Sequence, residues 1–238
     1  MAPFAAAARA LAPIAPAPWR DWTAAARADY LANLEPARNP GPLQMGEVMA
    51  YLRERLPADA IVTNGAGNYT GWVHRFYQYR RFRTQLAPTS GAMGYGLPAA
   101  VAAKAAHPDR AVVCFAGDGC FLMTGQELAT AVQYGLNVVV LVVNNSMYGT
   151  IRMHQEREFP GRVIATDLVN PDFAALARAF GAHGETVERT EDFAPAFERA
   201  MGAGRPALIE LRLDPEAITT RATLADIRKA AQKARSGR

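Results

Sequence analysis

Short segments that are apolar at nearly every position recur along the chain, and they alternate with segments in which apolar residues have the spacing of a helix. Strands are predicted at residues 60–63, 83–86, 111–116, 137–143, 185–188 and 207–213. A strand that is apolar throughout, such as 111–116, is typical of a sheet with helices on both faces. The pattern therefore predicts an α/β fold built on a parallel sheet flanked by helices on both faces.

The segments between these strands predict the helices that cover the sheet. Helices are expected at residues 43–56, from about 97 to 106, 126–134, 171–180 and 193–201, with a last one after Thr223. Asn170 and Gly181 are placed to cap the start and to stop the end of the helix at 171–180. Thr223, with Asp226 three residues later, forms a capping-box pattern at the start of the last helix.

The first 42 residues differ from the rest, because six prolines with alanines between them lie among the first forty residues. This composition predicts an Ala/Pro-rich linker around one helix, from Trp19 to about Leu31. We expect a linker and helix at 1–42, a main domain at 43–213 and a helical tail at 214–238. A cleaved signal sequence is not expected, because Arg9 interrupts the apolar stretch and no basic residue precedes it.

Composition narrows the class of protein. The 238 residues are 50% apolar and 20% charged, which suits a globular domain. The longest apolar run is far shorter than the ~18 residues that cross a bilayer, so no membrane partner is expected. The basic residues behind the net charge of +4 are scattered without interleaved aromatic residues, which argues against nucleic-acid binding. Cys114 and Cys120 form neither a disulfide framework nor a metal-ligand spacing, so a cytoplasmic location is expected.

Polar residues follow directly after two of the predicted strands. Gly-Asp-Gly at 117–119 follows the strand 111–116, and Asn-Asn at 144–145 follows the strand 137–143. One helix separates these strands, so their carboxyl ends lie at the same edge of a parallel sheet, where such folds bind ligands. Carboxylate and amide oxygens are hard ligands for Mg²⁺ or Ca²⁺, and Mg²⁺ completes its shell with phosphate oxygens and water. The sequence therefore predicts a joint site for a divalent cation and a diphosphate.

Each half of this pattern is common by itself, because Gly-Asp-Gly is also a turn sequence and Asn-Asn a loop sequence. The spacing makes the pair specific: Asn145 lies 27 residues after Asp118, and the interval holds a predicted helix and a buried strand. A dinucleotide-binding sheet is disfavoured, because no Gly-x-Gly-x-x-Gly opens the first helix after a strand.

The pair of segments is similar to the thiamine-diphosphate motif, and three further segments agree with it. Residues 89–100 resemble the loop and helix start of acetolactate-synthase-like enzymes, 62–69 their diphosphate-contacting turn, and 145–151 the loop after the metal-binding asparagine. From about Leu43 to Leu213 the chain thus resembles the C-terminal, diphosphate-binding domain of thiamine-diphosphate-dependent enzymes. The first forty residues resemble the end of the domain that precedes it in these enzymes.

The resemblance implies a role for each matching residue. Mg²⁺ would be bound by the side chains of Asp118 and Asn145 and by the carbonyl oxygen of Met147. Further cofactor contacts would come from Asn68, Tyr69, Gly117, Gly119, Cys120, Tyr148 and Gly149. Met93 would support the cofactor in its bent form, and the Gly91 carbonyl would accept a hydrogen bond from its 4′-amino group. Ordinary packing is the alternative role for Met93, and Cys120 is expected to pack rather than to react as a thiol.

The resemblance also implies an activity, the decarboxylation or ligation of 2-oxo acids, in which the cofactor is the electron sink. The family takes a required glutamate from a pyrimidine-binding domain, and Glu35, Glu47 and Glu54 lie in the wrong context to supply it. We therefore expect a chain that is inactive alone and that works with a pyrimidine-binding domain or subunit in a homo- or hetero-oligomer. A split subunit, a fragment and a non-catalytic cofactor-binding or interaction module are the alternatives.

One position departs from the family pattern. His154 stands where acetolactate synthases carry a tryptophan that faces the acceptor substrate. Acetolactate synthesis itself is therefore in doubt, while decarboxylation or another carboligation fits. Arg152 and His154 are the local candidates for substrate contact, because pocket shape sets specificity in this chemistry.

Overall fold

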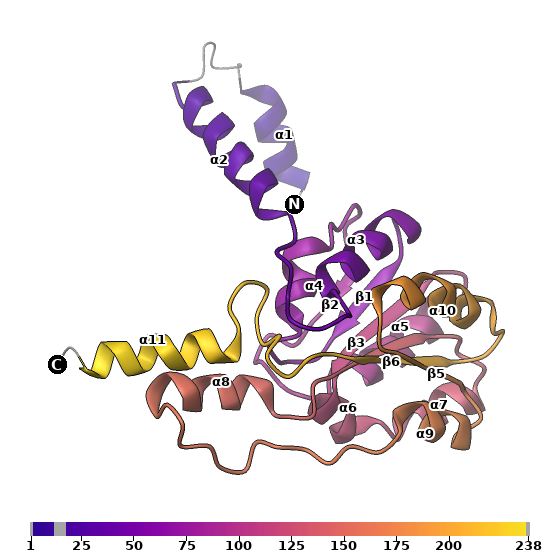
Figure 1. The fold of residues 1–238 in the computed structure, drawn as a ribbon. Coiled ribbons are helices and arrows are strands. Elements are labelled where there is room, and N and C mark those ends of the chain that lie inside the picture. The colour runs from indigo at the N-terminus through magenta and orange to yellow at the C-terminus, as the bar shows by residue number, and fades with distance from the viewer. Residues whose placement is uncertain (1, 12–17, 237–238) are drawn as a thin grey trace. The chain divides into compact units, whose positions relative to one another are not determined.

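Six parallel strands form the sheet of the computed structural model, in the order β2-β1-β3-β4-β6-β5 (Figure 1). The strands are β1 (Ile61–Asn64), β2 (Gln85–Leu86), β3 (Val112–Gly117), β4 (Val139–Asn144), β5 (His183–Val187) and β6 (Ala207–Arg212). The chain passes from β1 to β2 on one side and then to β3 on the other side of β1. The topological switch point, where such sheets bind ligands, therefore lies between β1 and β3. The predicted fold class is confirmed.

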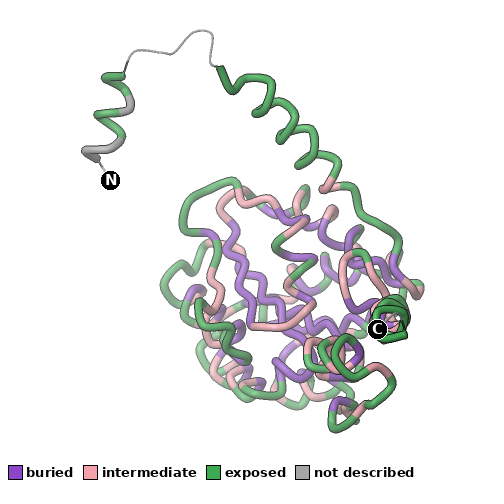
Figure 2. Tube along the Cα trace, turned by 90° about the vertical axis from the view of Figure 1, so that its left-hand side faces the viewer, coloured by how far each residue is buried: buried purple, intermediate pink, exposed green. Residues whose placement is uncertain are grey.

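Helices cover both faces of this sheet. They are α3 (Met45–Arg55), α4 (Thr70–Phe76), α5 (Gly96–Ala106), α6 (Asp118–Thr124), α7 (Glu127–Gln133), α9 (Phe173–Ala179) and α10 (Thr190–Gly202). Two further helices, α8 (Gly149–Glu158) and α11 (Leu224–Ser236), pack against each other. Val113 and Phe115 of β3 pack in one buried cluster with α3, α4 and α10. Val112 and Cys114 pack in a second cluster with α5, α6, α7 and α9. Successive residues of a strand face opposite sides, so a strand buried on both is apolar at each position; Figure 2 shows this buried interior in purple.

The structure describes residues 2–11 and 18–236, and the chain divides into two units, Met1–Glu35 and Pro36–Arg238. The first unit holds α1 (Ala2–Ala10) and α2 (Arg20–Asn33). The prediction of a single helix in this region was wrong, because the alanine-rich opening is also helical and alanine is the strongest helix former. The linker prolines at 13 and 16 lie outside the described residues.

Residues 36–42, which we expected in the linker, pack within the second unit. The Asn39 side chain donates to the Thr219 carbonyl over 3.1 Å and accepts from Trp72 Nε1 over 3.1 Å. Gln44 in turn donates through Nε2 to the carbonyls of Asn39 and Gly41. These polar contacts anchor the entry to α3.

Several helix boundaries differ from the prediction. The helices α4, α6 and α8 were not among the predicted helices. Asn170 does not cap α9, because Asp172 does so by accepting from Ala175 N over 2.8 Å. The capping box before α11 is confirmed, with both reciprocal hydrogen bonds present. In the described part of the chain, no helix combines the length and apolar character of a membrane span.

Candidate functional site

A cleft opens at the carboxyl ends of β1, β3 and β4, beside the topological switch point. The predicted residues that line it are Asn68, Tyr69, Met93, Gly117, Asp118, Gly119, Cys120, Asn145, Met147, Tyr148 and Gly149. They come from the segments that follow the three strands, except for Met93, which lies on the loop before α5. The pairing of Gly117 with Val143 across β3 and β4 brings the Gly-Asp-Gly and Asn-Asn segments to one edge.

Asp118 is the acidic group of this cleft. It is the first residue of α6 and is only 3% exposed. Its Oδ1 accepts from Gly119 N over 2.9 Å, and its Oδ2 accepts from Asn170 Nδ2 over 2.8 Å. Burial raises the pKa of Asp118 above its usual value, and the hydrogen bonds from Gly119 and Asn170 oppose that shift. A cation beside this carboxylate would compensate the charge that burial disfavours.

The donor set restricts the kind of metal. Among residues 2–11 and 18–236, no group of three or more His, Cys, Asp or Glu side chains converges on one point. A cation in the cleft would therefore be held by the Asp118 carboxylate together with neutral oxygens, and Asn145 and Met147 line the same cleft. One carboxylate with amide, carbonyl and phosphate oxygens suits Mg²⁺ and does not suit zinc. The residues present fit a Mg²⁺–diphosphate ligand.

Two positions of the cleft have no space for a side chain, because aromatic rings lie directly on their glycines. A Cβ atom at Gly119 would lie 2.5 Å from the ring of Tyr148, and one at Gly117 would lie 2.9 Å from the ring of Tyr69. Cys120 lies between these segments and accepts hydrogen bonds from Gly94 N at 3.2 Å and Tyr69 Oη at 3.4 Å. The Cys120 side chain is buried, and its role in packing rather than reaction stays a prediction.

The loop before α5 is only partly at the cleft. Met93 lines it and is 38% exposed. Gly91 does not line it; this residue is exposed, has a φ of +68° and has no atom within 4 Å of the Cβ that a substitution would add. The structure therefore brings Met93 to the site and leaves Gly91 at its margin.

Residues 65–211 match the family model described as "Thiamine pyrophosphate enzyme, C-terminal TPP binding domain". The chain belongs to this family. The matched residues include the turn after β1, the strands β3 and β4, and every residue of the cleft lining that precedes β6.

Three similar proteins each match most of this chain. The chain is 35% identical over 169 residues to the acetolactate synthase isozyme 2 large subunit of Escherichia coli, covering 70% of this chain and 31% of that protein. It is 32% identical over 170 residues to the sulfoacetaldehyde acetyltransferase of Alcaligenes xylosoxydans xylosoxydans, covering 69% and 28%. The thiamine diphosphate-dependent 4-hydroxybenzoylformate decarboxylase of Rhodococcus jostii RHA1 superposes with a TM-score of 0.70 at 33% identity, covering 76% and 34%. The chain spans about a third of the length of these relatives.

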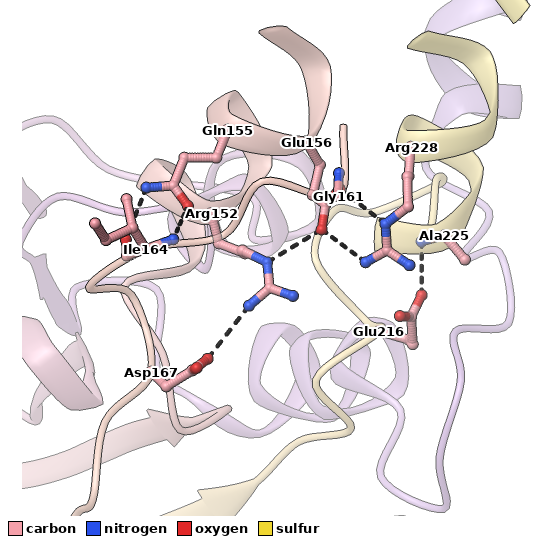
Figure 3. Close-up of polar contacts among 9 residues, drawn as sticks. All are labelled: Arg152, Gln155, Glu156, Gly161, Ile164, Asp167, Glu216, Ala225 and Arg228. Atoms are coloured by element: carbon pink, nitrogen blue, oxygen red, sulfur yellow. Dashed lines mark hydrogen bonds and ion pairs between the residues drawn. The ribbon is translucent and has the colours of Figure 1, made fainter. Parts of the chain in front are cut away.

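The two substrate candidates within this thiamine pyrophosphate enzyme domain lie outside the cleft lining. Arg152 forms ion pairs with Glu156 at 3.3 Å and Asp167 at 3.2 Å (Figure 3). His154 is exposed on α8. Ile151, in the first turn of α8, lines the cleft instead.

The segment after β6 also lines the cleft, although none of its residues was predicted at the site. Leu213, Ala217 and Ile218 belong to the lining. Asn68 links this segment to the turn after β1, because its Nδ2 donates to the Ile218 carbonyl over 3.1 Å while its Oδ1 accepts from Thr150. The signal was available: the segment follows directly after a buried parallel strand, which is the position where ligand-binding residues were sought.

An ion-pair cluster joins α8 to α11, the helix that follows this segment. Glu156 of α8 is fully buried and accepts from Arg152, Arg228 and the Gly161 backbone N–H (Figure 3). The hydrogen bonds from Arg228 of α11 are the main cause that lowers the pKa of Glu156 to about 2. Glu216 accepts from Ala225 N at the start of α11. The cluster therefore holds the wall formed by residues 213–218 against α8.

Proposed function

We propose that this domain binds thiamine diphosphate through Mg²⁺ in the cleft and serves as the diphosphate-binding half of an enzyme that decarboxylates or ligates 2-oxo acids. The observation that carries the proposal is the position of Asp118, which shares one cleft with Asn145 and Met147 beside the switch point. When bound, the cofactor supplies the electron sink for loss of CO₂. The chain's own residues bind and orient it.

Each residue has a defined task in this proposal. Asp118, Asn145 and Met147 hold the cation. Gly117 and Gly119 let the rings of Tyr69 and Tyr148 pack directly on the backbone beside the diphosphate. Asn68, Cys120 and Gly149 complete its contacts. Met93, which is half-exposed at the rim, supports the cofactor's bent form. Gly91 lies two residues before Met93 on the same loop but does not line the cleft. The contact from the Gly91 carbonyl therefore stays a prediction.

We propose that a pyrimidine-binding domain or subunit covers this cleft. Four apolar side chains near the cleft are exposed: Met93, Tyr95, Leu122 and Met123. The loop that carries Met93 and Tyr95 lies against Met123, since a Cβ at Gly94 would lie 2.9 Å from Met123 Cβ. An exposed apolar patch of this kind marks an interaction surface. A homo- or hetero-oligomer would bring the second domain, and its glutamate, to the cofactor.

A non-catalytic cofactor-binding module is the alternative. Asp118 is the only acidic residue among the described residues that line the cleft, so the glutamate of the reaction has to come from elsewhere. We further propose that residues 1–35, which form a separate unit, are the end of a preceding domain, and that the cofactor-binding domain extends from residue 36 to the cleft wall at 213–218, with the remaining residues as a helical tail. A cytoplasmic location is proposed because Cys114 and Cys120 are both free.

Calorimetric titration of thiamine diphosphate with and without Mg²⁺ tests the binding proposal. We expect binding only with Mg²⁺ in the wild type and none in Asp118→Ala, because the cation loses its only carboxylate. Asp172→Ala, which removes the cap of α9 outside the cleft, is the matched control and should bind like the wild type. Equal binding by Asp118→Ala and the wild type contradicts the site. Release of CO₂ from 2-oxo acids upon addition of a pyrimidine-binding partner separates the enzyme from the module.

A further inference from the structure

Asn170 lies between the two strand ends that carry the proposed cation ligands. Its Nδ2 donates to Asp118 Oδ2 over 2.8 Å and to Asn144 Oδ1 over 2.9 Å. Both neighbours present acceptor oxygens, so the amide nitrogen has to face them, and chemistry settles which way the amide points. One side chain thus cross-links the residue after β3 to the last residue of β4.

Asn144 is itself anchored from the neighbouring strand. Its Nδ2 donates to Glu210 Oε1 over 2.7 Å. Glu210 is buried in β6, and its second oxygen accepts from Thr186 Oγ1 of β5 over 3.1 Å. A chain of hydrogen bonds therefore runs from the interior of the sheet through Glu210, Asn144 and Asn170 to the Asp118 carboxylate.

We propose that Asn170 is a positioning residue of the cation site, with Glu210 as its anchor. The inference rests on the cation site proposed above. Each carboxylate oxygen has two lone pairs, so Asp118 Oδ2 can accept from Asn170 and still bind a cation. A donor behind a metal ligand fixes the direction of that ligand, and its loss weakens metal binding. Asn170 holds Asp118 in place before the cation arrives.

The Oδ1 atom of Asn170 supports the same role. Its Oδ1 is buried and has no hydrogen-bond partner among residues 2–11 and 18–236. Buried polar atoms of native proteins nearly always have a partner. Mg²⁺ in proteins keeps several of its waters, and a water of the cation's shell is a donor that suits this oxygen.

The helix that follows does not need this side chain. Asp172 caps α9 by accepting from Ala175 N. Asn170, which the sequence suggested as the cap, therefore does not have that role. Asp172 is therefore the natural control. Its substitution disturbs the same segment of backbone without touching the hydrogen-bond chain to Asp118.

Titration of the full chain with Mn²⁺ in excess thiamine diphosphate, followed by the electron paramagnetic resonance signal of free Mn²⁺, tests the inference. Asn170→Ala is expected to weaken Mn²⁺ binding by about 10- to 100-fold. Asp172→Ala is expected to lower the midpoint of urea unfolding and to bind Mn²⁺ like the wild type. Glu210→Ala should weaken Mn²⁺ binding, and Glu210→Gln should restore it, because its amide oxygen still accepts from Asn144.

The outcomes are distinct. If Asn170→Ala binds Mn²⁺ as tightly as the wild type, or if Asp172→Ala loses as much affinity, the positioning role is wrong. If Glu210→Gln loses as much affinity as Glu210→Ala, the anchor is wrong. A wild-type chain that takes up no Mn²⁺ refutes the cation site itself, and this inference with it.

Discussion

Arg228 donates both Nε and Nη2 to the carboxylate of Glu156, at 2.8 and 2.7 Å, although 72 residues separate the two in the chain. The arrangement is bidentate, and Glu156 is fully buried (Figure 3). Charge-assisted pairs of this geometry are the strong ones, and breaking one leaves a buried charge without its partner. The contact joins α8, which begins at the cleft, to α11, which follows the cleft wall at 213–218.

Glu156→Gln is expected to lower the free energy of unfolding by about 3 kcal/mol at pH 7. The pKa of Glu156 falls from the ordinary 4.5 to about 2 in the folded protein. Its stabilisation is therefore fully present above about pH 5 and is lost as the pH falls toward 2. Urea unfolding of both proteins between pH 7 and 2 measures the difference, which should shrink with acid.

The control for this prediction is Glu54→Gln. Glu54 is exposed and pairs with Arg53 only at 3.8 Å, so its substitution should change stability by less than about 0.5 kcal/mol at any pH. A difference between Glu156→Gln and the wild type that stays constant from pH 7 to 2 would contradict the assignment of this stabilisation to the ion pair.

Arg228→Ala is expected to loosen α11 from α8. Amide hydrogen exchange within 224–236 should speed up by more than about tenfold, because local opening becomes easier by at least ~1.4 kcal/mol. Lys233→Ala, an exposed position on the same helix, is the control and should leave exchange unchanged. Equal exchange in both variants would show that the Glu156 pair does not hold the helix.

Gly96→Ala is expected to destabilise the protein by about 1–3 kcal/mol, because the added methyl group overpacks a buried site. A Cβ at Gly96 would lie 2.9 Å from Gly65 N and 3.1 Å from the Phe115 carbonyl oxygen, both of them backbone atoms. Gly202→Ala, where no atom lies within 4 Å of the added Cβ, should be neutral or slightly stabilising. Denaturant unfolding compares the two, and equal stability would mean that the backbone around α5 yields more easily than this packing implies.

Met93→Ala separates a ligand contact from a core contact. Met93 is 38% exposed, whereas Met45 is fully buried in α3. Met45→Ala should cost about 2–5 kcal/mol of stability, and Met93→Ala less than about 0.5 kcal/mol. Met93→Ala should instead weaken Mg²⁺-dependent thiamine diphosphate binding about fivefold, the value of roughly 1 kcal/mol of lost apolar contact. Unchanged binding with lowered stability would assign Met93 to ordinary packing.

The parts of the site that follow a strand were predictable, and the parts that depend on a side-chain partner were not. Asp118 and Asn145 were expected at one edge because parallel strands joined by one crossover end together. Asn170 was assigned to a helix cap, since Asn before an apolar helix is a standard cap and nothing local distinguishes it from Asp172. Arg152 was assigned to the substrate, because the sequence does not reveal that Glu156 and Asp167 already hold its guanidinium.

The parallel sheet with two covered faces, and the edge that carries Asp118 and Asn145, were predictable from the chain, because strand burial and crossover length leave a local pattern of apolar residues. The pairing of polar groups across long separations was visible only in the folded molecule: Glu156 with Arg228, and Glu210 with Asp118 through two asparagines. The physical reason is that a buried hydrogen bond depends on where its partner's backbone arrives, and that position is set by the packing of the whole domain.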